Sequence, residues 1–200
     1  MKQEHATTIS SNTNSSSGIE ILLLKLQSED GAERKHARQM LEKIGKSAVP
    51  AIMQLLSHRR EHVRWEACKT LESIRDRKAE YALVHALLDD DMDVRWVAAD
   101  AIITLEEHAF NLKQSAIESE HHAIIPLLEI IGEHFDSVFI REAAHHILHT
   151  LKRKNILDKN VEEVLIALED LGSPWKVAFA ASIALDYLRS KEKNKEELKH

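Results

Sequence analysis

Apolar residues recur along the chain at helical spacing, and the clearest example is the segment Val94–Leu105. On a helical wheel of about 100° per residue, six side chains share one arc and four share the opposite arc. The first set is Val94, Arg95, Ala98, Ala101, Ile102 and Leu105, and the second is Trp96, Val97, Asp100 and Thr104. We therefore predict an amphipathic helix whose Trp96 faces away from the core, where a large aromatic side chain needs a partner.

Weaker copies of this helix occur on both sides of it. Four copies align without gaps around an Arg: Glu33–Ile44, Val63–Ile74, Val94–Leu105 and Ile140–Leu151. The Arg residues of the first three copies are about thirty residues apart, and the last interval is about fifteen residues longer. A fifth, looser copy, Val177–Leu188, has Ala178 in place of the Arg.

A second apolar helix is predicted after each of the first four copies. These helices are Ala48–Leu56, Tyr81–Leu88, Ile124–Ile131 and Val161–Leu171, and Ile19–Leu26 is an unpaired leading helix. Neither helix of a pair can bury its apolar face alone, so successive pairs stack on a continuous core. The sequence therefore predicts an all-α solenoid of about five helix pairs.

The pattern resembles the HEAT-like repeats of the phycobilisome-lyase type. In these repeats a Val-Arg-x-x-Ala-Ala-x-x-Leu helix follows a short acidic turn and precedes an Ala-Val-Pro-x-Leu helix. The resemblance covers roughly Asp30 to Leu188, although Arg60 stands where Asp30 and Asp91 provide the acidic turn residue in other copies. It implies an armadillo-like superhelix, and it implies no single activity because the family is functionally mixed.

The resemblance also implies a binding surface. In such proteins the Val-Arg helices line the concave side and present the side chains one, two, five and nine positions after the Arg. The partner-binding residues expected on this basis are Lys35, Trp65, Glu66, Lys69, Trp96, Asp100, Glu142, His146, Phe179 and Tyr187. Trp65 and Trp96 are expected to lie side by side. They either hold neighbouring helices in register or anchor a groove for a protein or peptide, a role in which Trp is enriched.

Composition narrows the class of partner. The chain of 200 residues has 27 basic and 33 acidic side chains, which are well mixed, so nothing indicates a surface for a polyanion. Nucleic acid is therefore disfavoured, although the two Trp residues keep a HEAT-like DNA glycosylase open as a lesser alternative. No apolar run approaches the ~20 residues that span a bilayer. The single cysteine, Cys68, cannot form an internal disulfide, which favours a cytoplasmic protein.

The ends of the chain differ from its middle. Residues 1–18 are polar and rich in Ser, Thr and Asn, which predicts a disordered tail. The repeat array is expected over residues 19–189, and residues 190–200 form a charged tail. The longer third interval places an insertion at 106–122, which serves either as a recognition loop or as filler.

Thirteen histidines raise the question of a metal site. Glu142, His145 and His149 are spaced three and four apart and project from one side of a helix, which makes them a weak candidate. Solvated histidines are the favoured interpretation, so no metal and no cofactor are expected. The chain has no Gly-rich phosphate loop, paired-cysteine motif or nucleophile elbow.

These observations favour a non-enzymatic scaffold or adaptor that binds a protein or peptide partner through its concave face. The alternative from another class is a chaperone similar to the phycobilin lyases, in which the groove would hold a tetrapyrrole.

Overall fold

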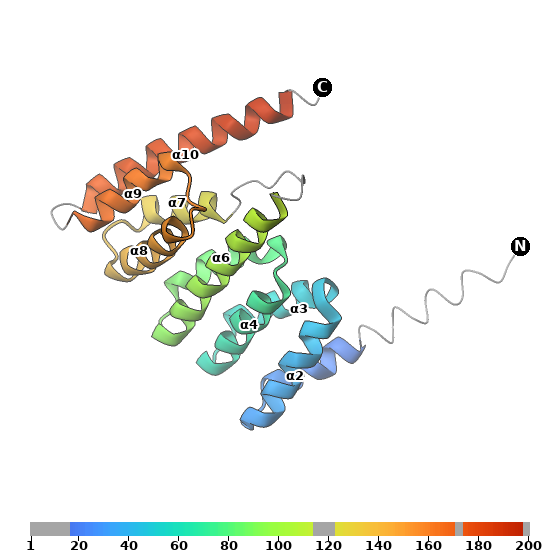
Figure 1. The fold of residues 1–200 in the computed structure, drawn as a ribbon. Helices are drawn as coiled ribbons and strands as arrows, with labels where there is room; N and C mark the ends of the chain where they lie inside the picture. The colour runs from blue at the N-terminus through green and yellow to red at the C-terminus, as the bar shows by residue number, and fades with distance from the viewer. Residues whose placement is uncertain (1–16, 114–122, 171–173, 198–200) are drawn as a thin grey trace, which may run out of the picture.

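The computed structural model describes residues 17–113, 123–170 and 174–197. This part of the chain is helical and contains no strand, which confirms the predicted all-α solenoid (Figure 1). A first helix spans residues 17–26. It is followed by α2 (Gly31–Ile44), α3 (Val49–Gln54), α4 (Glu61–Ile74), α5 (Glu80–His85), α6 (Met92–Lys113), α7 (Ile124–Glu133), α8 (Val138–Arg153), α9 (Lys159–Glu169) and α10 (Pro174–Glu197). Short 3-10 turns, η1 (Gly45–Ala48), η2 (Leu55–Ser57), η3 (Arg77–Ala79) and η4 (Ala86–Leu88), flank α3 and α5.

The helices form two layers. The helices that carry the repeat Arg, α2, α4, α6 and α8, lie side by side in the first layer, and α3, α5 and α7 make up the second (Figure 1). Between the layers runs one continuous apolar core, in which Leu41, Leu71, Ile102 and Leu127 are fully buried or nearly so. Because each helix buries only one face, its neighbours in both layers are needed to exclude water from that face.

Each repeat Arg folds back over the turn that precedes its own helix. The Nη1 atoms of Arg34, Arg64, Arg95 and Arg141 donate to the carbonyl oxygen six residues earlier, at 2.8 to 3.0 Å. All except Arg64 also donate to the carbonyl five residues earlier. The guanidinium group thereby satisfies carbonyl groups in the turn between repeats, and each of these turns has only three or four residues.

The position four residues before the repeat Arg is the N-cap of the helix. Asp30 accepts from the Ala32 amide, Asp91 from the Asp93 and Val94 amides, and Ser137 from the Ile140 amide. Such caps satisfy amide groups that have no partner within the helix. The acidic turn of the repeat pattern is therefore a helix cap, and the second copy lacks it, because Arg60 makes no side-chain cap bond.

Replacing Arg60 with serine should increase the free energy of unfolding by about 1 kcal/mol, because serine can cap α4. The native side chain contributes little in exchange. Its Nε is buried without a hydrogen-bond partner, and its ion pair is with Glu29, which is largely exposed. Urea denaturation measures the change, with Arg59→Ser at the exposed neighbouring position as the control. A variant no more stable than the parent would contradict this account of the turn.

The last two helices depart from the two-layer order. α9 follows α8 in the first layer, while α10 packs against α7 and α9 in the second. Arg189 of α10 and Tyr81 of α5 both bond to Glu129 of α7, which fixes α10 there. The repeat pattern predicts that the fifth copy, Val177–Leu188, continues the row of Arg helices, and the structure differs from this prediction. It is the copy with Ala178 in place of the repeat Arg, so it lacks the guanidinium group that bonds to the preceding turn in the other four copies.

Two helices extend beyond the predicted boundaries of the array. α6 continues to Lys113, through the first half of the predicted insertion, and the buried Glu106 on it accepts a bond from the Ala123 amide. α10 continues to Glu197, into the predicted charged tail. The rest of the predicted insertion, 114–122, and most of the N-terminal tail, 1–16, lie outside the described residues. None of the described helices is both long and apolar enough to span a bilayer.

Candidate functional site

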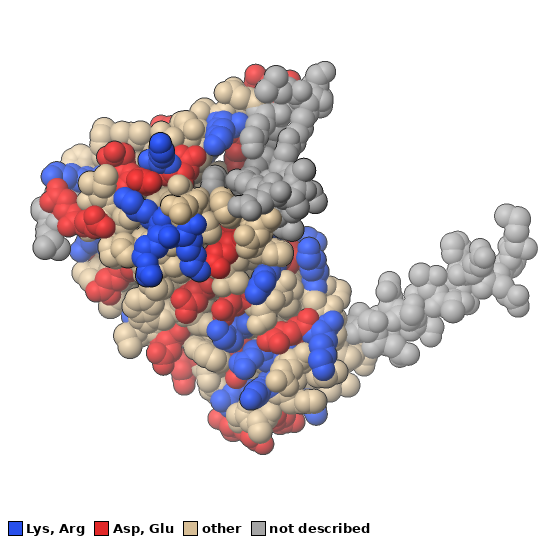
Figure 2. Space-filling view, in the orientation of Figure 1, with Lys and Arg blue, Asp and Glu red and all other residues tan. Residues whose placement is uncertain are grey.

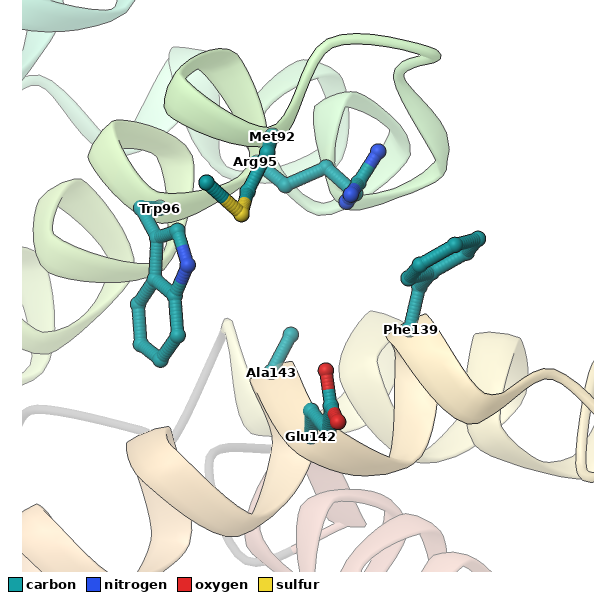
Figure 3. Close-up of a pocket in the computed structure, with 6 residues that line it drawn as sticks. All are labelled: Met92, Arg95, Trp96, Phe139, Glu142 and Ala143. Atoms are coloured by element: carbon teal, nitrogen blue, oxygen red, sulfur yellow. The ribbon is translucent and has the colours of Figure 1, made fainter.

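Trp96 lies in a cleft between α6 and α8 (Figure 3). The cleft has a volume of about 60 Å³ and is lined by Met92, Arg95, Trp96, Phe139, Glu142 and Ala143. Figure 3 shows Trp96 and Met92 extending from α6 toward the helix that carries Phe139 and Glu142. The guanidinium carbon of Arg95 lies 4.2 Å from the Phe139 ring centroid, so α6 and α8 also meet through a cation–π contact.

Three large apolar side chains around this cleft are exposed together, and we call them the Trp96 patch: Met92, Trp96 and Phe139. Trp96 is 44% exposed, Phe139 56% and Met92 59%. The rim is polar. The Trp96 ring meets the His146 ring edge-on with centroids 4.9 Å apart, and His146 Nε2 lies 3.3 Å from Asp100 Oδ1. An apolar centre with a polar rim is the usual composition of a protein-binding surface.

Trp65 has a different environment from Trp96. It is half-buried against the core, and the Arg38 guanidinium carbon lies 5.8 Å from its ring centroid. Arg38 belongs to α2, the preceding Arg helix, whereas the His146 ring beside Trp96 belongs to the following one. Among the ring contacts of the described residues, the two indoles thus meet different neighbours and do not stack on each other.

Glu66 is not presented at the surface, contrary to what the repeat offsets implied. It is only 5% exposed, and its carboxylate accepts from Arg34 Nε at 3.3 Å and from Arg38 Nη1 at 2.7 Å. Arg34 and Arg38 of α2 reach across to α4, so the side chain that the repeat offsets place at the surface is covered by the neighbouring helix. Glu66 therefore links two repeats.

The other expected binding residues fall into two groups. Asp100, Glu142 and His146 gather around the Trp96 patch. Lys35 is exposed on α2, and Lys69 bonds to Glu72 of its own helix at 2.6 Å. Phe179 and Tyr187 are exposed on α10, which lies in the second layer, so they are not part of the same row.

The histidines of α8 do not assemble with Glu142. The His145 and His149 rings stack with centroids 5.5 Å apart, and His145 Nε2 lies 3.8 Å from Glu169 Oε1 on α9. Glu142 instead lines the cleft at Trp96. Within residues 17–113, 123–170 and 174–197, no three His, Cys, Asp or Glu side chains are grouped to hold a metal ion.

Cys68 is the one thiol of the chain, and it is buried in α4. Burial raises the pKa of the thiol to about 12, so the group stays protonated near neutral pH. Since the thiolate is the reactive form, this cysteine packs as a small apolar side chain.

Met92 and Phe139 were missed by the sequence analysis, because they lie before the aligned core of the repeat. Met92 stands three residues before Arg95, and Phe139 two residues before Arg141. The signal was present: both are large apolar residues in the first turn of a helix, where polar and acidic residues are preferred. Both lie in the first turn of adjacent Arg helices, which indicates a shared surface.

Part of the chain matches a known family of repeats. Residues 19–103 match the family model of HEAT repeats. Residues 19–103 are HEAT repeats. The HEAT-like resemblance inferred from the repeat pattern is therefore confirmed, and the match includes α2, α4 and the first half of α6, which carries Trp96. No curated protein sequence matches the chain.

Solved structures extend the likeness in fold to most of the chain. One is a chain in the complex of CpcE and CpcF of phycocyanin lyase from Nostoc sp. PCC7120, with a TM-score of 0.56 and 22% identity. The alignment covers 84% of this chain and 98% of that one. A designed armadillo repeat protein aligns with a TM-score of 0.36 and 18% identity, over 85% of this chain and 99% of that one. At 22% identity the first likeness shows a common fold.

Proposed function

We propose that this HEAT-repeat chain is a non-enzymatic scaffold or adaptor, and that it binds a protein or peptide partner on the first layer with the Trp96 patch as the anchor. The observation that carries the proposal is the joint exposure of Trp96, Met92 and Phe139 across two repeats. Clustered exposed apolar side chains are characteristic of interaction sites. Trp is also enriched among residues whose truncation costs ~2 kcal/mol or more in binding.

The charges around the patch favour a protein partner over a polyanion. Arg95 is balanced by Glu142 across the cleft, and Asp100 lies beside His146. Figure 2 shows acidic and basic side chains mixed over the face of the molecule in view. A DNA-binding role would call for a basic stripe along this face, so the glycosylase alternative gains no support here.

A tetrapyrrole chaperone is the second candidate, and its support is the fold shared with a chain from the phycocyanin lyase complex. The size of the cleft at Trp96 argues against a tetrapyrrole bound at that place. Sites for small molecules commonly have volumes of ~300–1,000 Å³, and the cleft at Trp96 has about 60 Å³. Co-expression with a bilin would produce coloured protein if the second candidate were correct.

The variant Trp96→Ala/Phe139→Ala should lose the partner while keeping the fold. Each side chain is about half exposed, so truncation of both should lower the free energy of unfolding by only about 2 kcal/mol. Removal of two anchors should weaken binding by a factor of about 30 or more. Affinity purification from the native host with parent and variant identifies the proteins that depend on the patch, and calorimetric titration of the leading protein measures the factor.

Leu24→Ala is the matched control, because Leu24 is also a largely exposed apolar residue but lies on the helix 17–26, outside the Trp96 patch. It should retain the same partner. Retention of the partner by the double variant, or its loss only together with unfolding, would overturn the proposal.

A further inference from the structure

The helix α10 is apolar on two opposite faces. Its inner face, Val177, Ala181, Ala184 and Leu188, is buried against its neighbours. Its outer face carries a second apolar row, which we call the α10 stripe: Trp175, Phe179, Ile183 and Tyr187, exposed by 64%, 63%, 54% and 37%. A helix that completed its packing within one chain would have polar side chains on the outer face.

The α10 stripe is continuous along the helix. Its members are spaced four residues apart, so they follow one another over about 18 Å of helix. Figure 1 shows α10 along the edge of the molecule. Its inner contacts are with α7 and α9, and within the described part of the chain no helix packs over the stripe. Four large apolar side chains in one row indicate a docking surface for another polypeptide.

The residues exposed on α10 match those of a second α10 helix that runs in the opposite direction. If a second copy lies antiparallel with the two-fold axis near Ala181, Trp175 meets Tyr187 of the second copy and Phe179 meets Ile183 of the second copy. The same register brings Lys176 opposite Asp186 of the second copy, twice per dimer. On the helical wheel Lys176 and Asp186 lie within the arc of the stripe.

The charged pair is available for this contact. Lys176 and Asp186 are both exposed, and Asp186 has no ion pair among the described residues. Lys176 Nζ lies 2.6 Å from Asp170 Oδ2, an exposed contact at the start of the helix. Exposed contacts of this kind are weak and exchange readily.

We propose that α10 is a homodimerisation helix, through which two copies of the chain pair antiparallel across the α10 stripe. The same surface patch serves both copies, as a two-fold interface requires. The α10 stripe lies in the second layer, away from the Trp96 patch on α6 and α8. The dimer consequently presents two Trp96 patches, and dimerisation goes beyond the proposed partner binding.

The size of the stripe sets the expected affinity. Aromatic side chains bury ~150–250 Å² each when fully covered, so the exposed parts of the four residues amount to roughly 400–500 Å² per copy. A standard interface buries about 800 Å² per partner. The dimer is therefore a weak one, with a dissociation constant in the micromolar range.

Sedimentation velocity of the full chain, from about 5 to about 300 µM, brackets such a constant. The parent should shift from monomer to dimer over this range, and Phe179→Asp should stay monomeric with an unchanged melting temperature. The matched control is Leu24→Asp, which alters a similarly exposed apolar residue on the helix 17–26 and should still dimerise. A parent that is monomeric throughout, or a Phe179→Asp variant that dimerises like the parent, would overturn the proposal.

A charge exchange tests the antiparallel register. Lys176→Glu and Asp186→Lys should each weaken the dimer by about fivefold, because each places like charges opposite one another twice. The double variant Lys176→Glu/Asp186→Lys should recover the parental constant. A double variant that is as weak as either single variant would exclude this pairing of α10 helices.

Discussion

Replacing Arg64 with alanine should lower the free energy of unfolding by about 3–5 kcal/mol, because it leaves a buried carboxylate without its partner. Arg64 is itself buried, and it donates to both carboxylate oxygens of Asp89 at 2.7 Å and to Asp90 at 2.6 Å. Burial by itself would raise the pKa of Asp89, but hydrogen bonds from Arg64 and the Asp91 amide hold it below its ordinary value. Chemical denaturation measures the loss.

Arg141→Ala is the matched control for this prediction. Arg141 occupies the same position of its repeat and donates to the Phe135 and Asp136 carbonyls, but no carboxylate pairs with it in the described chain. Its loss should cost about 1 kcal/mol, the contribution of ordinary hydrogen bonds. If both variants lost the same free energy of unfolding, the ion pairs of Arg64 with Asp89 and Asp90 would not be the source of its contribution to stability.

Glu66→Ala should lower the free energy of unfolding by about 2–3 kcal/mol, because hydrogen bonds between charged groups are the stronger ones. The change removes the acceptor of both Arg34 and Arg38 and breaks the link between α2 and α4. The exposed Glu142 is the control, and Glu142→Ala should change stability by no more than about 0.5 kcal/mol. A Glu66→Ala variant of parental stability that binds the partner more weakly would return Glu66 to the binding surface.

The repeat pattern predicted the stacking of Arg helices because their register depends on residues within each copy. Arg34, Arg95 and Arg141 make the same two carbonyl bonds in the same positions. The placement of α9 in the first layer and of α10 in the second was not predicted. It depends on contacts between helices that are distant in sequence, such as the bond from Arg189 of α10 to Glu129 of α7, which are 60 residues apart.

The two Trp residues also show that the pattern within one copy does not reveal the contacts made by a neighbouring copy. A helical wheel gives Trp65 and Trp96 the same direction, but it does not include the neighbouring repeat. Arg38 from the preceding repeat covers part of Trp65, while Trp96 stays open beside His146. Truncation of Trp65 would therefore remove packing as well as any binding contact, which is why the partner test uses Phe139 in its place.

The bonds from each repeat Arg to the turn before it also determine where extra residues can be inserted into such a protein. An added residue between repeats would move the carbonyl groups out of reach of the guanidinium, since each acceptor lies a fixed five or six residues back. The turn within a pair carries no such constraint. The extra length of the third repeat is found there, between the Arg95 helix and α7. Loops inserted between the two helices of a pair should therefore be tolerated. The same loops inserted between successive pairs should disrupt the packing of one repeat on the next.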